Sequence, residues 1–88
     1  MTFELEPLLI DLTVPKGCYE VTLTIKSESD TVFSVYEENI GYVAENETIK
    51  NGECRDLTFI VTTDENISVM IYCDGNITST AIASYISA

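Results

Sequence analysis

One strictly alternating segment, residues 14–25, constrains this chain more than any other feature. One face of the segment carries the apolar residues Tyr19, Val21, Leu23 and Ile25, and Glu20, Thr22 and Thr24 fall on the other face. A slip of one residue would expose the whole apolar row, so the pattern specifies both a half-buried strand and its register. Pro15 and Gly17 just before it are typical of a turn.

The same period of two recurs along the chain. It predicts strands at 10–14, 19–25, 31–37, 42–49, 55–62, 67–73 and 76–86. No segment has the periodicity or composition of a helix. We therefore expect an all-β fold: a small antiparallel β-sandwich, of jelly-roll or immunoglobulin type, with about six to eight strands. Residues 1–88 should form a single domain.

Three turn signals predict hairpins between neighbouring strands. Pro15 and Gly17 separate the first two strands, and the dipeptides Asn51-Gly52 and Asp74-Gly75 separate later ones. Asn-Gly and Asp-Gly are the dipeptides that a type I′ hairpin turn prefers. Each signal is therefore expected to join two strands of one sheet.

Charge excludes several classes of partner. The chain has 15 acidic and 4 basic residues, with a formal net charge of −11. Such a surface repels nucleic-acid phosphates and anionic lipids, so we expect neither nucleic acid nor a membrane as partner. No apolar run approaches the ~20 residues of a membrane-spanning helix. The acidic start of the sequence is unlike a signal peptide, which favours a cytoplasmic protein or an excised domain of a longer one.

The three cysteines are far apart in sequence and odd in number. Reduced thiols are favoured, and a Cys18–Cys54 disulfide is the alternative. By alternation, Cys73 continues the face of Ile67, Val69 and Ile71 and should pack as a small core residue.

Catalysis is not expected. The absence of histidine removes the usual general base and the commonest zinc ligand, and the four glycines are isolated, so no loop cradles a phosphate. Pairs of carboxylates remain, among them Glu37 with Glu38, as glycoside hydrolysis requires. A small sandwich buries too little to raise a carboxyl pKa for that role.

Two sets of residues are candidates for ligand binding. Tyr36, Tyr42 and Tyr72 are candidates for a platform on which sugar rings stack, although tyrosines on strands more often cap a core with the hydroxyl at its edge. Asp64, Glu65 and Asp74 are candidates for a calcium site if they lie at one end of the fold, with solvated loop charges as the alternative.

The run of residues 14–25, Val-Pro-Lys-Gly-Cys-Tyr-Glu-Val-Thr-Leu-Thr-Ile, resembles a strand-turn-strand segment in a known family. The family is the non-catalytic β-sandwich module that precedes the catalytic domain of some bacterial SGNH (GDSL-type) carbohydrate esterases, the rhamnogalacturonan acetylesterase-like group. Segments 31–37, 52–62 and 67–75 follow in the same order. Arginines of that module are replaced by Glu37-Glu38 and by residues 62–64, and the Gly-Asp-Ser-Leu block of the esterase is absent.

The resemblance implies an accessory or interaction module that is associated with a carbohydrate esterase and has no hydrolase activity of its own. Its partner would be a catalytic domain or a carbohydrate. Two alternatives stay open: a carbohydrate-binding module, with or without calcium, and a structural subunit that forms homo-oligomers through its sheet edges.

Overall fold

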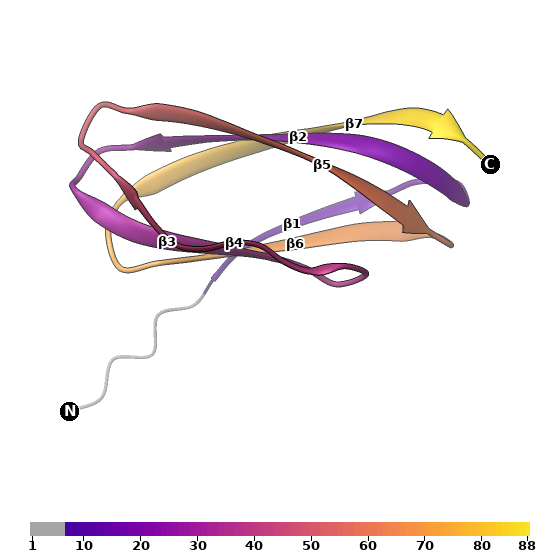
Figure 1. The fold of residues 1–88 in the computed structure, drawn as a ribbon, viewed down its shortest axis with the longest axis horizontal. Helices are drawn as coiled ribbons and strands as arrows, with labels where there is room; N and C mark the ends of the chain where they lie inside the picture. The colour runs from indigo at the N-terminus through magenta and orange to yellow at the C-terminus, as the bar shows by residue number, and fades with distance from the viewer. Residues whose placement is uncertain (1–6) are drawn as a thin grey trace.

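The computed structural model describes residues 7–88, and its regular secondary structure consists of seven β-strands (Figure 1). They are β1 (Leu8–Thr13), β2 (Gly17–Ser27), β3 (Thr31–Glu37), β4 (Gly41–Ile49), β5 (Cys54–Thr63), β6 (Asn66–Cys73) and β7 (Ile77–Ser87). The described part contains no helix. Every predicted strand is present, and its bounds lie within two residues of the prediction.

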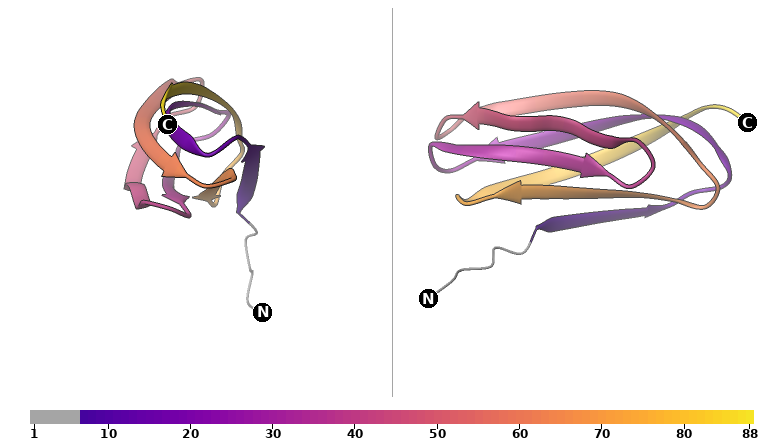
Figure 2. Two further views of the ribbon diagram at one scale, coloured as in Figure 1. Left: turned by 90° about the vertical axis from the view of Figure 1, so that its right-hand side faces the viewer. Right: turned by 60° about the horizontal axis from the view of Figure 1, so that its bottom comes forward.

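The strands form two antiparallel sheets that pack face to face (Figure 2). One sheet has the order β1-β6-β3-β4 and the other has the order β5-β2-β7. The predicted small antiparallel β-sandwich is thus confirmed. Consecutive strands alternate between the sheets, except for β3 and β4. In an immunoglobulin sandwich the first two strands are neighbours in one sheet, whereas here β1 and β2 lie in different sheets, as in a jelly roll.

The core lies between the inner faces of the two sheets. Strand β2 is central in its sheet, and its predicted apolar row is almost fully buried, with Val21, Leu23 and Ile25 at 0% exposure. This row pairs with Leu57, Phe59 and Val61 of β5 on one side and with Ala81 and Ala83 of β7 on the other. Phe33, Val35, Ile67, Val69 and Ile71 complete the core from the opposite sheet.

The three predicted hairpins are wrong. β1 pairs with β6 and not with β2, so the Pro15–Gly17 turn carries the chain from one sheet to the other. The connections after β4 and β6 also cross between sheets, and β3–β4 is the one hairpin within residues 7–88. The dipeptides mark where the chain turns, but the destination of the next strand depends on which sheet buries its apolar face.

The Asn51-Gly52 turn keeps its shape despite this different role. The Glu53 N–H donates to the Lys50 carbonyl at 2.9 Å, which closes a four-residue β-turn. The backbone φ is positive at Gly52 (85°) but not at Asn51. A type I′ turn requires positive φ at both central residues, so this turn follows the type II pattern instead.

Gly75 is required for close packing and not for backbone conformation, since its φ is not in the positive region. A Cβ atom at Gly75 would lie against Ser29 Oγ and 2.9 Å from Thr31 Cβ. The Asn76 N–H also donates to Ser29 Oγ at 3.1 Å. The β6–β7 connection is therefore pressed onto the β2–β3 connection, and this contact joins the two sheets at one end.

Two asparagine substitutions distinguish the conformational role of Gly52 from the packing role of Gly75. Gly52→Asn should change the unfolding free energy by less than about 1 kcal/mol, because Asn tolerates positive φ and a Cβ there meets nothing within 4 Å. Gly75→Asn should destabilise by about 1–3 kcal/mol, because its Cβ overlaps Thr31. Urea unfolding of both variants measures the difference. Equal destabilisation would show that the two glycines serve the same purpose.

Glu37 is a buried carboxylate that organises the β3–β4 hairpin. Its side chain has 0% exposure. Its Oε1 accepts hydrogen bonds from the N–H groups of Asn39 at 2.6 Å and Ile40 at 3.2 Å, and its Oε2 accepts one from Asn39 Nδ2 at 3.1 Å. These donors compensate the negative charge of the buried carboxylate. Glu37, which the sequence offered with Glu38 as a possible catalytic pair, therefore has a structural role in the turn.

Glu37→Ala should destabilise the fold by about 2–4 kcal/mol, because two backbone donors and one side-chain donor lose a charged acceptor. The matched control is Glu38→Ala, which removes the same charge from an exposed side chain and should change stability by less than about 0.5 kcal/mol. Chemical denaturation followed by circular dichroism gives both values. A similar loss in the two variants would contradict the role assigned to the Glu37 carboxylate.

Candidate binding face

The outer face of the four-stranded sheet carries a row of apolar and aromatic side chains that crosses all four strands. The register places Leu9 of β1 opposite Met70 of β6, Met70 opposite Tyr36 of β3, and Tyr36 opposite Tyr42 of β4. Tyr72 lies two residues after Met70 on the same face. We call these five residues, Leu9, Tyr36, Tyr42, Met70 and Tyr72, the tyrosine face.

The three tyrosines predicted as a platform are thus brought together. The rings of Tyr36 and Tyr42 pack edge to face, with centroids 5.1 Å apart and an interplanar angle of 77°. The Tyr72 hydroxyl lies 3.6 Å from Met70 Sδ. Tyr42 is 55% exposed and Tyr72 is 40% exposed, so both rings offer apolar surface to solvent. Tyr72 faces outward, opposite the buried Ile67, Val69 and Ile71 of the same strand.

Local sequence explains why these side chains point outward. Val35 and Ile71 face the core at 0% and 1% exposure, so their neighbours Tyr36 and Tyr72 must face solvent. Tyr42 is a different case, because alternation from the buried Ala44 would turn it inward. Two register shifts in the β3–β4 ladder intervene, and the second, between Val35 and Tyr36, places Tyr42 on the outer face.

A polar network borders the tyrosine face on the same side of the sheet. Asp11 pairs with Ser68 across β1 and β6, and the Ser68 hydroxyl donates to Asp11 Oδ1. Asn66 Nδ2 donates to Ser68 Oγ at 3.1 Å. These residues were not among the predicted site residues. The spacing of Asn66 and Ser68 on β6 shows that these two residues share a face with Met70 and Tyr72. Nothing in the sequence indicates that Asp11 of β1 lies beside them.

The predicted calcium residues are not brought to one place. Asp64 and Glu65 precede β6 and Asp74 follows it, so they lie at opposite ends of an eight-residue strand, about 25 Å apart. Asp74 accepts a hydrogen bond from Thr31 Oγ1 at 2.6 Å. Within residues 7–88, no group of three or more Cys, Asp or Glu side chains is placed to hold a metal ion. The prediction that these three residues lie at one end of the fold is therefore wrong.

The cysteines are likewise separate. Cys18 lies at the start of β2, and Cys54 pairs with Lys26 near the end of the same strand. This spacing is far beyond the roughly 7 Å between Cα atoms that a disulfide allows, so a Cys18–Cys54 bridge within the chain is excluded. Cys73 packs against the core, as predicted, and its sulfur accepts a hydrogen bond from the Gly75 N–H at 3.2 Å.

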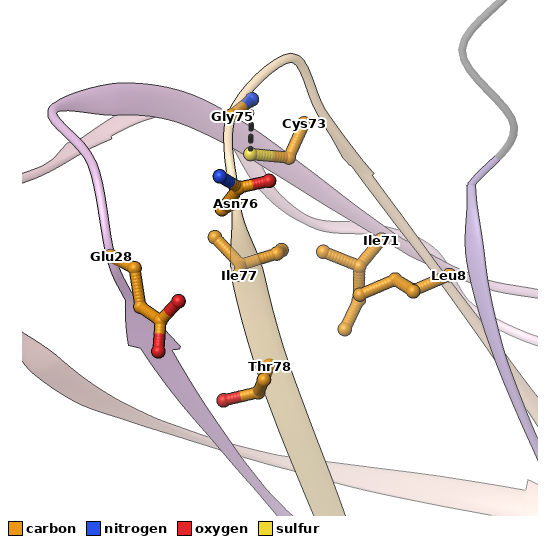
Figure 3. A pocket seen from close by; sticks show the side chains of 8 residues that line it. All are labelled: Leu8, Glu28, Ile71, Cys73, Gly75, Asn76, Ile77 and Thr78. Carbon is orange, nitrogen blue, oxygen red and sulfur yellow. Dashed lines mark hydrogen bonds between the residues drawn. The ribbon is translucent and has the colours of Figure 1, made fainter.

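A hollow of about 420 Å³ opens between β1 and the start of β7 (Figure 3). Leu8, Ile71 and Ile77 form its apolar part, while Glu28 and Thr78 lie at its polar side. The hollow shows that the two sheets are not sealed along the side of the sandwich where β1 and β7 are the edge strands. It lies apart from the tyrosine face, which covers the outer surface of the four-stranded sheet.

Comparison with models of protein families, with curated proteins and with solved structures found no match. The described residues include no helix long and apolar enough to cross a membrane. The chemistry of the tyrosine face is therefore the basis on which its function is inferred.

Proposed function

We propose that this chain is a non-catalytic binding module that holds a carbohydrate on its tyrosine face. The observation that carries the proposal is the register that aligns Leu9, Met70, Tyr36 and Tyr42 in one row across four strands. Singly exposed apolar residues are ordinary on protein surfaces, but a continuous row on one sheet is typical of an interaction site.

The polar network beside this row favours a carbohydrate over a purely apolar ligand. A sugar ring has C–H groups that pack on aromatic surface and hydroxyl groups that need hydrogen-bond partners. The tyrosine face offers the first kind of surface, and Asp11, Ser68 and Asn66 offer carboxylate, hydroxyl and amide groups next to it. An anionic polysaccharide is disfavoured by the net charge of −11, so the proposed ligand is a neutral one.

The non-catalytic part of the proposal is supported by composition and by Glu37. The chain has no histidine, and the buried Glu37 carboxylate accepts the backbone N–H groups that hold the β3–β4 turn. Association with a carbohydrate esterase remains part of the proposal, and sequencing the region adjoining this module tests it. A neighbouring domain with a Gly-Asp-Ser-Leu block is the expected result.

Binding should be detected on an array of plant and bacterial polysaccharides, in the presence of calcium, and then quantified by titration calorimetry. Tyr42→Ala and Tyr72→Ala should each weaken the interaction by about tenfold, the equivalent of one lost aromatic contact. Ile60→Ala is the control, because Ile60 is 49% exposed but lies on β5 of the other sheet, away from the tyrosine face, and it should change affinity less than twofold.

Two results would contradict this function. One is the absence of binding by the unmodified chain to every polysaccharide on the array. The other is an equal loss of affinity in Ile60→Ala and Tyr42→Ala, which would place the ligand away from the tyrosine face.

A further inference from the structure

β7 is an edge strand that lacks the features by which sheet edges normally avoid pairing with another chain. Its eleven residues, Ile77–Ser87, include no proline, no glycine and no charged side chain. The uncharged run extends from Gly75 to Ala88, although the chain as a whole has a net charge of −11. A long, uncharged edge strand exposes unpaired backbone N–H and C=O groups that favour addition of a further strand.

The other three edge strands are each protected. β1 is short, at six residues, and carries Asp11. β4 carries Glu45 and Glu47 and is interrupted by two register shifts in its pairing with β3. β5 carries Arg55 and Asp56. Charges, short length and irregularity are the usual means of preventing edge pairing, so their absence is specific to β7.

β7 also presents the most exposed large apolar side chain of the described residues. Ile82, at its centre, is 69% exposed on the outer face of the three-stranded sheet, and Ile86 is 51% exposed. The neighbouring outward side chains are Thr78, Thr80 and Ser84, which are small or β-branched and suit a paired strand. The one irregularity in its pairing with β2 falls near its end, between Cys18 and Tyr19.

We propose that β7 pairs antiparallel with β7 of a second copy and forms a two-fold symmetric dimer with one continuous six-stranded sheet. A second copy is the occupant that the charges favour: two molecules of charge −11 repel each other, and β7 is the edge strand of residues 7–88 that pairs without bringing charged side chains of its own together. Antiparallel pairing of identical strands gives a closed, self-complementary interface.

The adjoining side of the sandwich adds to this interface. β1 and β7 are edge strands on the same side, and the two-fold axis relating the β7 strands brings the two β1 strands toward each other as well. The inward side chains of β1 are incompletely covered, with Leu8 at 42% exposure and Ile10 and Leu12 only partly buried. Dimerisation would remove part of this apolar surface from water.

Sedimentation analysis of the full chain from low micromolar to near millimolar concentration tests the proposal. A reductant is included because Cys54 is exposed and could form intermolecular disulfides. We expect a concentration-dependent rise in mass from 9.8 kDa to twice that value. A mass that stays at the monomer value over the whole range would overturn the proposal.

Lysine substitutions identify the edge. Ile82→Lys on β7 should raise the dissociation constant at least about tenfold, because the two-fold axis brings the two new charges together. Ile60→Lys is the matched control: Ile60 is also exposed on the outer face of this sheet, but on β5, and the change in net charge is the same. Thr80→Lys, at an exposed polar site on β7, should act in the same direction as Ile82→Lys.

Hydrogen exchange provides a readout that does not depend on substitutions. Alternate backbone amides of β7 should become protected as the concentration rises, while those on the open edges of β4 and β5 should not change. Protection of β4 or β5 without β7, or equal weakening by Ile60→Lys and Ile82→Lys, would overturn the β7 interface. Neither measurement involves a carbohydrate, so the result is independent of the proposed binding function.

Discussion

Burial of the inner row of β2 is the interaction on which the rest of the structure depends. β2 is the central strand of the smaller sheet, and Val21, Leu23 and Ile25 are completely covered by the opposite sheet. Because β5 and β7 pair with its two edges, the register of β2 determines which of their side chains face inward. A shift of one residue would place the threonines of β2 in the core and expose its whole aliphatic row to solvent.

The same requirement orients the candidate binding face. The four-stranded sheet covers β2 with Val35, Ile67 and Ile71, and this commits the alternate residues of β3 and β6 to the solvent side. The outward positions of Tyr36 and Tyr72 therefore follow from the amino-acid sequence through alternation alone. The position of Tyr42 does not, since it depends on irregular pairing of β4 that has no composition signature.

Strand positions were predictable because each depends on a local pattern, whereas connectivity depends on distant partners. Leu9 and Met70 are adjacent in the ladder although most of the chain separates them, and nothing near either residue indicates the other. The separation of the calcium candidates, in contrast, could have been predicted from the sequence. The predicted strand at 67–73 lies between Asp64 and Asp74, and an extended strand necessarily carries its two flanking turns to opposite ends of a sheet.

The proposed edge pairing and the proposed binding face occupy different sheets, so both can operate in one assembly. Antiparallel strands of a continuous sheet are related by a two-fold axis perpendicular to that sheet, and such an axis turns both tyrosine faces to the same side of the dimer. A polysaccharide repeats its binding unit along one chain. Under the two proposals, two sites that face one polymer would bind it with a high effective concentration for the second contact, so a shallow, solvent-exposed face would not need a deep pocket. In this proposed arrangement the unprotected edge of β7 and the open tyrosine face would act together in one mode of binding.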